Sequence, residues 1–355
     1  MGNIKIYSSI GLEPWKWDNP DLFGIGGSET SHIEMARRLG ERGHIVSSYC
    51  PMEGPLVQQG NVSWMPFDVA APETEPGLWI VYRDPTFFDQ HLDPFGKYWF
   101  IAQDCDYSWT PERLEKVDRY WCLCKEHASF TARKYPQIKD KIYVTSNGVK
   151  AEKIKPLLGK FERNLNKCVY TSSPDRGLLF LLQNWFRVLE RNPLAECHVF
   201  YGFENILKLL GGDQGQELGS LKAEIEKLMN QQGIVWRGRI PQPQLWEEYL
   251  TANAWYYPTD WPETSCISCM EAQACGAIPV TSNYWALKEN VQWGWKTNGP
   301  PQHNNIDKVL TIDYLCDILG RDHPERSEMQ KWALETFDWE KMVDQWEIFI
   351  NADCI

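Results

Sequence analysis

The chain has 355 residues, with 36 basic and 48 acidic side chains and a formal net charge of −12. At roughly 100 to 200 residues per domain, this length favours two domains, and a hydrophobic content of 43% excludes a chain that is disordered throughout. The negative charge opposes general binding to nucleic acids or anionic membranes, because both require a basic surface. We therefore expect no nucleic-acid partner.

Three features predict a cytoplasmic location. The first residues lack the apolar run of a signal peptide, and we find no transmembrane segment, because no stretch is long and apolar enough to span a bilayer. Eleven cysteines, an odd number scattered along the chain, are typical of free thiols in a reducing compartment. The 18 tryptophans are an unusual excess, and we expect most of them to pack in cores or between domains.

The first half of the chain alternates short apolar runs with helical patterns. The runs have almost no polar face, which is typical of parallel strands covered on both sides. Residues 28–42 predict a helix, because Ile33, Ala36 and Leu39 recur at helical spacing and Gly43 follows as a stop signal. The expected strands are 4–8, 45–49, 78–82, 98–102, 120–124 and 142–145.

A lysine-rich stretch without a sustained period, residues 150–167, precedes a second alternating half. Here the expected strands are 167–171, 197–201, 235–236, 254–257 and 278–281, the expected helices are 178–189, 221–229, 245–250 and 266–275, and 325–355 is a helical tail. Two such halves predict two doubly wound α/β domains facing a cleft. We expect domains over 1–155 and 156–336, with a final helix over 337–355 that returns to the N-terminal domain.

Segment 258–280 places two carboxylates eight positions apart around a predicted helix start. Glu263 falls in the turn between strand and helix, at the sheet edge where α/β proteins bind ligands, and Glu271 lies about two turns further on. Backbone N–H groups near Thr264 and Ser265, at the positive end of the helix dipole, form a natural phosphate site. Carboxylates accept hydrogen bonds from hydroxyl groups, which suits a sugar nucleotide. These residues alone leave a second interpretation open, in which both glutamates are solvated neighbours of an ordinary helix.

This segment resembles the Glu-x7-Glu signature of retaining glycosyltransferases of family 4, which have two Rossmann-like domains in the GT-B fold. Further segments resemble the family in the same order, namely 26–29 (Gly-Gly-Ser-Glu), 147–149 (Asn-Gly-Val), 173–179, 235–240 and 337–340. The resemblance implies transfer of a sugar, expected to be a hexose, from a nucleoside-diphosphate donor to a hydroxyl acceptor on a glycan, lipid or protein. A UDP- or GDP-sugar is the expected donor, with no obligatory metal or other cofactor.

The resemblance also implies roles for particular residues. Glu263 faces the donor sugar and Arg176 replaces the diphosphate-binding lysine of the family, so these two are the expected catalytic residues. The base is expected to lie against segment 237–240 and the ribose against Glu271. The expected donor-binding residues are Gly26, Gly27, Thr264, Ser265, Arg239 and Glu271. Gln103 and Asp104 are the expected acceptor-side residues, in the N-terminal domain.

Several positions depart from the family pattern. Thr171 stands where the family usually has a second diphosphate-binding arginine, and Gln103 stands where many members carry a histidine. Segment 284–286 replaces a pair of glycines with Tyr-Trp-Ala. These departures leave an alternative open, a catalytically silent GT-B protein that serves binding or assembly.

Three weaker patterns favour other sites and are not adopted. Segment 24–29 resembles a dinucleotide fingerprint but has Glu29 at the position of the third glycine. Asp104 and Asp106 have the spacing of a metal-binding acidic triplet, a short pattern that is common by chance. Cys266 and Cys269 lack a second pair at zinc-finger spacing, so core packing is the favoured interpretation. We therefore expect no metal site.

Overall fold

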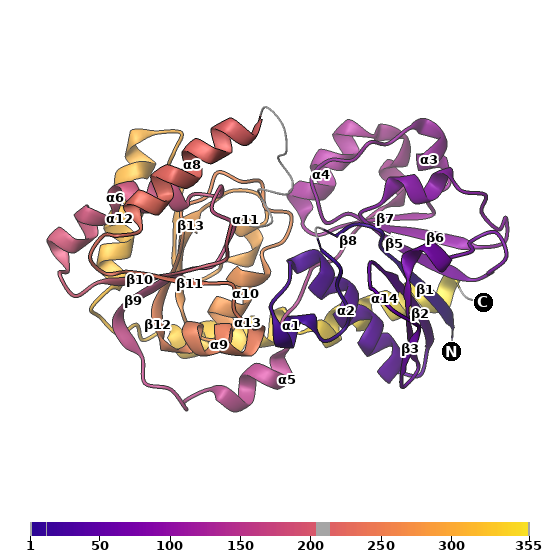
Figure 1. The fold of residues 1–355 in the computed structure, drawn as a ribbon, viewed down its shortest axis with the longest axis horizontal. Helices are drawn as coiled ribbons and strands as arrows, with labels where there is room; N and C mark the ends of the chain where they lie inside the picture. The colour runs from indigo at the N-terminus through magenta and orange to yellow at the C-terminus, as the bar shows by residue number, and fades with distance from the viewer. Residues whose placement is uncertain (1, 12, 204–213, 354–355) are drawn as a thin grey trace. The chain divides into compact units, whose positions relative to one another are not determined.

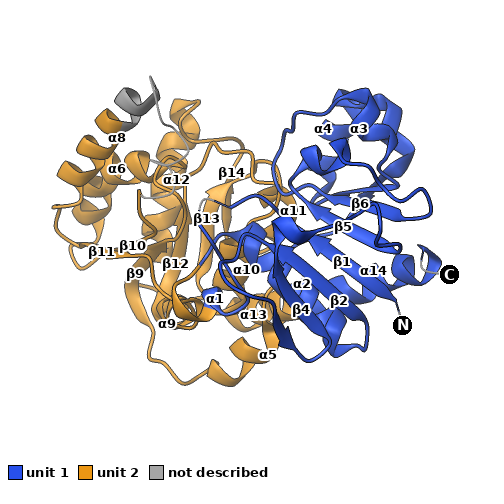
Figure 2. Ribbon diagram, turned by 45° about the vertical axis from the view of Figure 1, so that its right-hand side comes forward, with its two compact units in different colours: residues 1–20, 25–148, 337–355 blue, residues 21–24, 149–336 orange. Residues whose placement is uncertain are grey.

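The computed structural model describes residues 2–11, 13–203 and 214–353. Residues 354–355 of the expected helical tail lie outside the described residues. The chain forms two compact units (Figure 2). Unit 1 contains residues 1–20, 25–148 and 337–355, and unit 2 contains residues 21–24 and 149–336.

Unit 1 is built on a sheet of eight strands, β1 (Asn3–Tyr7), β2 (Ile45–Cys50), β3 (Val57–Gln59), β4 (Val62–Pro66), β5 (Leu78–Tyr82), β6 (Lys97–Ile101), β7 (Arg119–Cys122) and β8 (Ile142–Val144). Their order is β3-β4-β2-β1-β5-β6-β7-β8, and every pair is parallel except β3 with β4. Because β1 pairs with β2 on one side and with β5 on the other, the direction of chain progression reverses between β1 and β5. Ligands of open α/β sheets bind at the carboxyl edge of such a switch point.

The helices of unit 1 are α2 (Gly27–Glu41), α3 (Pro111–Glu115), α4 (Lys125–Lys134) and α14 (Trp339–Asp353). Short 3-10 helices occupy Phe67–Val69, Pro85–Asp89 and Pro136–Lys141. α14 packs against α2, and the Trp346 indole contacts the rings of Trp99 and Trp121 at centroid distances of 6.0 Å. The last segment of the chain is therefore part of the hydrophobic core of unit 1. The short helix α1 (Asn19–Leu22) begins in unit 1 and ends in unit 2.

Unit 2 has a parallel sheet of six strands, β9 (Asn164–Tyr170), β10 (Glu196–Phe200), β11 (Ile234–Gly238), β12 (Ala252–Tyr257), β13 (Ile278–Ser282) and β14 (Trp295–Thr297). The strand order is β11-β10-β9-β12-β13-β14. β9 pairs with β10 on one side and β12 on the other, so the switch point of this unit lies between β9 and β12. The carboxyl ends of these two strands are where a ligand site is expected.

The helices of unit 2 form two groups (Figure 1). One group consists of α9 (Gln242–Thr251), α10 (Ile267–Ala274) and α13 (Arg326–Thr336), and the other of α6 (Leu178–Arg191), α8 (Gln214–Leu228) and α12 (Asn305–Ile318). The short helices α5 (Ala151–Ile154) and α11 (Leu287–Asn290) and the 3-10 turn Lys155–Leu157 complete the unit. Both units are thus doubly wound α/β sheets, as the sequence predicts.

The expected strands all overlap observed ones, but three observed strands were not predicted. β3 and β14 have three residues each, and β3 is largely polar, so neither gives an apolar run. β4 alternates buried and partly exposed residues in an edge hairpin with β3. The helices α4 and α12 were also missed, and segment 150–167, expected as a connection, contains α5 and the start of β9.

Core packing accounts for most of the tryptophan excess, because ten of the eighteen tryptophans are buried. The described cysteines are all free, and eight of these ten are buried. Within the part of the chain that the structure describes, no helix has both the length and the apolar character needed to cross a membrane.

Candidate active site

Two expected catalytic residues meet at the switch point of unit 2. Arg176 lies just before α6, which follows β9, and Glu263 lies between β12 and α10. Nη1 of Arg176 is 3.2 Å from Oε1 of Glu263. The Glu263 side chain is only 9% exposed, so its charge requires such a partner. The sequence separates these residues by 87 positions, and the two adjacent strands bring them together.

The hydroxyl of Tyr257, the last residue of β12, also donates a hydrogen bond of 2.5 Å to Oε1 of Glu263. Burial, reinforced by the Glu263 carboxylate, raises the pKa of Tyr257 well above its ordinary value, so the phenol keeps its proton. Oγ of Ser172 donates to the Tyr257 oxygen at 3.1 Å. Tyr257 was not among the residues expected from the sequence, where it is simply the end of an apolar run.

Trp261 covers the other side of Arg176. The guanidinium carbon lies 4.4 Å from the centroid of the Trp261 ring, a cation–π contact, while the indole is 42% exposed. Burial opposes the charge of Arg176, but the Glu263 carboxylate holds its pKa above the ordinary value. Arg176 is therefore a fixed positive charge beside the N-terminus of α6, where the helix dipole adds to it.

Gly177 lets α6 begin directly against the end of β12. Its φ of 106° lies in the left-handed region, and a Cβ atom here would be 2.3 Å from the carbonyl oxygen of Pro258. Only glycine satisfies both conditions without strain. This close approach places Arg176 at the switch point.

Glu271 lies in a second cluster, built with the start of α9. Its Oε1 accepts hydrogen bonds from Nε2 of Gln242 at 2.6 Å and from the indole N–H of Trp246 at 2.9 Å. The glutamate is 3% exposed. The sequence predicted Glu271 but not these two partners, which come from a different helix.

Three polar atoms near these residues are buried and have no hydrogen-bond partner among the described residues. They are Nε of Arg176, Oγ of Ser265 and Oε1 of Gln242. Buried polar atoms are nearly always paired, so each such exception requires an explanation. A polar ligand can satisfy all three. It would offer an acceptor to Nε of Arg176 and hydrogen-bonding groups to Oγ of Ser265 and Oε1 of Gln242.

Thr264 and Ser265 precede α10, as the sequence predicts. Thr264 is buried, and Cys266 is the N-cap residue of the helix, with no side-chain hydrogen bond to cap it. The side chain of Cys266 therefore does not cap the first N–H groups of α10, and these groups can bind an anion. Arg239 follows Gly238 at the end of β11, the strand at the far edge of the sheet, and β10 separates that strand from β9.

Thr171, the departure that follows β9, has a structural role. Its Oγ accepts hydrogen bonds of 2.9 Å from the Tyr249 hydroxyl and from the Trp255 indole. Both donors belong to completely buried side chains. An arginine at this position would remove the acceptor that both groups share.

The glycine loop of unit 1 lies at the start of α2. Gly26 is its N-cap residue and Gly27 its first residue. A Cβ atom on Gly26 would collide with the Glu29 carboxylate, which occupies this space. The absence of a side chain at Gly26 thus allows the carboxylate of the first turn to fold back over the helix N-terminus.

Arg83 connects this loop to the expected acceptor-side residues. Its Nε is 2.8 Å from Oδ2 of Asp104, and its Nη1 is 3.5 Å from Oε1 of Glu29. Burial opposes its charge, but Asp104 and Glu29 hold the pKa of Arg83 above the ordinary value. Arg83 also has a φ of 64°, which is uncommon for a residue other than glycine. No sequence pattern signals an arginine in this conformation.

Gln103 and Asp104 lie after β6, and they differ in exposure. Gln103 is 7% exposed and exchanges amide hydrogen bonds of 3.3 and 3.1 Å with Asn147, which follows β8. The Asp104 side chain is 47% exposed. Asp104 is therefore the residue of this pair that a ligand can reach.

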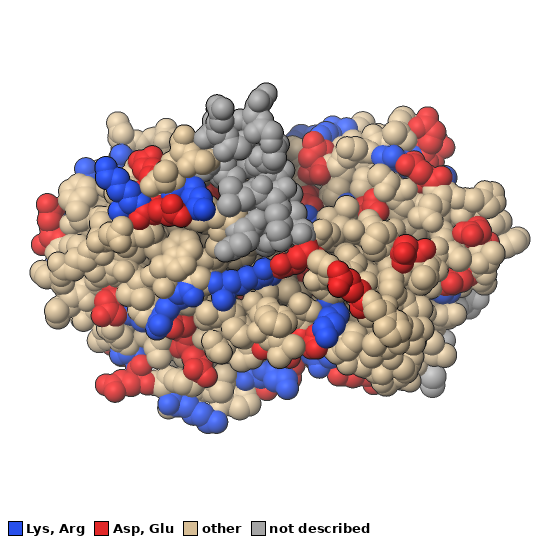
Figure 3. Space-filling model, viewed as in Figure 1, with Lys and Arg blue, Asp and Glu red and all other residues tan. Residues whose placement is uncertain are grey.

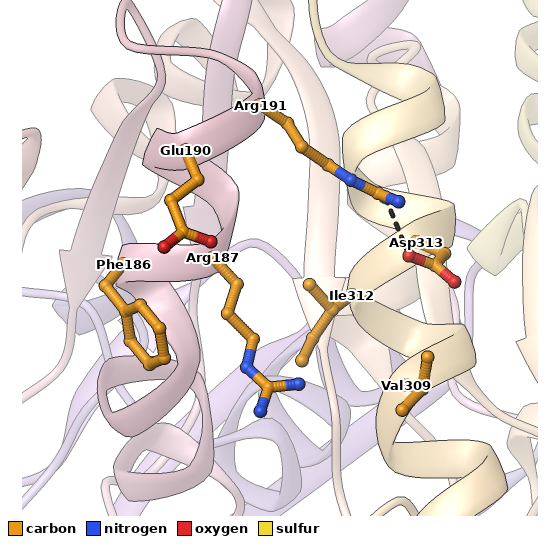
Figure 4. A pocket seen from close by; sticks show the side chains of 7 residues that line it. All are labelled: Phe186, Arg187, Glu190, Arg191, Val309, Ile312 and Asp313. Atoms are coloured by element: carbon orange, nitrogen blue, oxygen red, sulfur yellow. Dashed lines mark ion pairs between the residues drawn. The ribbon is translucent and has the colours of Figure 1, made fainter.

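The described residues contain no cluster of three or more histidine, cysteine or acidic side chains arranged to hold a metal ion. Asp106 pairs with Lys134, and Cys266 and Cys269 are buried, with thiol pKa values raised by burial. A cavity of about 400 Å³ lies between α6 and α12 (Figure 4). None of the expected site residues lines it. Arg191 and Asp313 form an ion pair of 2.7 Å at its rim.

Comparisons with known proteins agree with this architecture. Residues 176–296, about a third of the chain, match a family model described as "Glycosyl transferases group 1". No curated protein sequence matches the chain at a significant level.

Solved structures share the fold over almost the whole chain. A UDP-forming trehalose-phosphate synthase from Burkholderia xenovorans has a TM-score of 0.70 and 11% identity, covering 99% of both chains. A sucrose-phosphate synthase from Thermosynechococcus elongatus has a TM-score of 0.67 and 12% identity, with the same coverage. The catalytic domain of starch synthase IV from Arabidopsis thaliana, bound to ADP and acarbose, has a TM-score of 0.66 and 10% identity, again covering 99% of both chains.

The two doubly wound units have the GT-B fold of these enzymes. The family match covers Arg176, Glu263 and Glu271, the residues that the structure places at the carboxyl edge of unit 2 or next to it. Part of unit 2 thus matches a glycosyltransferase family model, and the chain as a whole shares its fold with glycosyltransferases.

Proposed function

We propose that the chain is a retaining glycosyltransferase similar to family 4, which transfers a hexose from a nucleoside-diphosphate sugar to a hydroxyl group. The observation that carries this proposal is the cluster of Arg176, Glu263 and Tyr257 at the switch point of unit 2. It combines a fixed cation, a carboxylate and two helix N-termini. A sugar diphosphate needs these groups, because its phosphates are anionic and its sugar offers hydroxyl donors.

The proposed reaction requires charge stabilisation on the leaving group. The bond between C1 of the sugar and the diphosphate oxygen breaks, and its electron pair stays on the diphosphate. The acceptor oxygen then bonds to C1 on the same face, and its proton passes to the departing diphosphate. Arg176 and the N-termini of α6 and α10 favour this step, because their positive charge is fixed before the reaction. We propose that this charge suffices without an obligatory metal ion.

The nucleotide part of the donor is proposed to bind beside Glu271. Gln242 and Trp246 fix the orientation of the Glu271 carboxylate through its Oε1. A group that accepts hydrogen bonds from two ribose hydroxyls needs such a fixed orientation. The unpaired Oε1 of Gln242 supports this placement, since a ribose hydroxyl can donate to it. We propose a UDP- or GDP-sugar as donor and a carbohydrate or glycoconjugate as acceptor.

We propose a cytoplasmic location because of the state of the cysteines. The ten that the structure describes are free, and most are buried. Thiols persist in this form where the compartment is reducing.

One observation favours the alternative of a silent GT-B protein. Thr171 is committed to Tyr249 and Trp255 and adds no charge to the phosphate site. Such a protein would keep the fold but hold diphosphate weakly. The intact contacts of Arg176 and Glu263 favour the enzyme.

Two measurements on the whole protein test the proposal. A panel of nucleoside-diphosphate sugars is screened for release of the nucleoside diphosphate, and the anomeric configuration of any transferred sugar is determined by NMR. We expect release with a UDP- or GDP-hexose and a product with the donor's configuration. An inverted product would contradict the retaining mechanism, and no release with any donor would favour the silent alternative.

A further inference from the structure

The switch point of unit 1 carries an ion-pair cluster that the proposed donor chemistry does not use. Glu29, Arg83 and Asp104 come from the first turn of α2, the end of β5 and the end of β6. β1, the strand that precedes α1 and α2 in the chain, and β5 are the strands between which the sheet order reverses. This is the position at which open α/β sheets bind ligands.

The backbone holds Arg83 in place at some cost in strain. Its φ of 64° is unfavourable for a side chain, while its N–H donates to the carbonyl of Ile101 at 3.2 Å. The next residue, Asp84, accepts a hydrogen bond from Ser9, two residues after the end of β1. Strained residues that their surroundings hold firmly are concentrated at functional sites. The result is a guanidinium that lies across the carboxyl ends of β5 and β6.

The charges of this cluster do not suit an anionic ligand. Arg83 is its one cation, and two carboxylates already pair with it, so the three side chains carry a net charge of −1. An incoming phosphate must displace a carboxylate from Arg83 and approach the other one. A hydroxyl group meets no such penalty, since it can donate to the carboxylate of Asp104, whose side chain is 47% exposed.

Neighbouring charges do not reverse this balance. Asp106 is paired with Lys134, which leaves that pair neutral. His32, which shares α2 with Glu29, and His127, on which the Asp104 charge acts, have pKa values lowered by burial to about 3 and about 4, and both are neutral at physiological pH. The face of the molecule in Figure 3 shows acidic and basic side chains interspersed over its described residues.

We propose that Glu29, Arg83 and Asp104 form the acceptor-specificity site, and that it selects an uncharged polyhydroxyl acceptor over a phosphorylated one. The inference rests on the proposed function, because it presupposes sugar transfer. Arg83 is its positioning residue. It holds both carboxylates at the switch point, and Asp104 is the group that contacts the acceptor.

Matched acceptor pairs test this proposal in the whole protein. Glucose is compared with glucose 6-phosphate and mannose with mannose 6-phosphate, as stimulators of nucleoside-diphosphate release from the preferred donor. We expect the uncharged member of a pair to stimulate release at least tenfold more strongly. Asp104→Asn should reduce this preference by about tenfold, because it removes one negative charge and keeps the shape.

Arg83→Met should abolish acceptor-stimulated release and leave thermal stabilisation by the nucleoside diphosphate unchanged, and Arg83→Lys should restore only part of the stimulation. The control is Arg119→Met. Arg119 has a similar exposure, 17% against 22%, and also pairs with a carboxylate, that of Asp353, but it is the first residue of β7 and lies at the opposite, amino edge of the sheet. It should keep the stimulation and the preference.

The proposal is overturned if the phosphorylated member stimulates equally or better, if no uncharged sugar stimulates release, or if the Arg83 variants behave like Arg119→Met. Failure of the proposed function gives a different result. In that case no nucleoside diphosphate stabilises the wild-type protein and no donor is cleaved, and the acceptor proposal falls with it.

Discussion

The hydroxyl of Tyr257 and the carboxylate of Glu263 are joined by a hydrogen bond of 2.5 Å. The same oxygen of Glu263 faces Arg176, so two donors from β12 and from the start of α6 fix one carboxylate. Glu263 is thereby oriented before any ligand binds, and its second oxygen remains for a different partner. This arrangement makes the orientation of Glu263 dependent on Tyr257.

Tyr257→Phe should reduce kcat/KM about 10- to 100-fold, because a hydrogen bond to a charged group contributes about 1.5–3 kcal/mol. Affinity for the nucleoside diphosphate should not change, since Tyr257 acts through Glu263. The matched control is Tyr256→Phe, the adjacent buried tyrosine of the same strand, which should keep full activity. Equal kinetics for the two variants would contradict this role of Tyr257.

Gly177→Ala should unfold or strongly destabilise unit 2, by more than about 2 kcal/mol, because the new Cβ atom combines positive-φ strain with a clash. Gly159→Ala is the control, since Gly159 has a φ of 76° but no atom within 4 Å of the position that a Cβ atom would take. It should lose only about 1 kcal/mol. Urea unfolding of both variants measures the difference, and equal losses would show that the contact with Pro258 does not matter.

Thr171→Val should destabilise the protein by about 2–4 kcal/mol, because it leaves the Tyr249 hydroxyl and the Trp255 indole buried without an acceptor. Thr171→Ser keeps the hydroxyl and should lose less than about 1.5 kcal/mol. Denaturant unfolding again gives the comparison. If valine is tolerated as well as serine, Thr171 does not hold these two side chains.

The fold could be predicted largely from apolar runs, because fully buried parallel strands contain little else. Leu78–Tyr82 is entirely buried and was predicted with its observed bounds. β3 could not be predicted in this way, since the Gln58 and Gln59 side chains are exposed at a sheet edge. Short edge strands are specified by their partners rather than by their own composition.

The site residues were predictable only where the residue type and its sequence pattern indicate the chemistry. Glu263 and Glu271 stand at a spacing that places one before and one within a helix, whereas Arg83 follows an ordinary strand. Its placement depends on a positive φ and on carboxylates 54 and 21 positions away along the chain, in Glu29 and Asp104. Gln242, the partner of Glu271, was missed for the same reason, since folding alone brings it near.

Stability should fall at mildly acidic pH because of two buried histidines. Burial lowers the pKa of His32 to about 3 and that of His127 to about 4, against an ordinary value of about 6.5. Below pH 6.5 the unfolded chain therefore binds protons that the folded chain does not, and stability is lost until the pH reaches these lower values.

At pH 5 this loss amounts to roughly 2 kcal/mol for each histidine relative to pH 7, at 1.36 kcal/mol per pKa unit. Urea unfolding of unit 1 at the two pH values should show this loss of stability, and His127→Gln should remove about half of the loss. His303→Gln is the control, since the His303 side chain is 58% exposed. An unchanged pH dependence in His127→Gln would contradict the assignment.

Nucleotide binding tests the central claim most directly, namely that unit 2 holds a nucleoside-diphosphate sugar. Thermal unfolding of the protein is measured with UDP, GDP, ADP and dTDP, for the wild type and for Arg176→Ala, Glu271→Ala and Asp104→Ala. We predict that UDP or GDP raises the Tm of the wild type, that Arg176→Ala and Glu271→Ala each abolish this shift, and that Asp104→Ala retains it. No shift with any of the four nucleotides, or a shift that depends on Asp104 rather than on Arg176 and Glu271, would contradict the account.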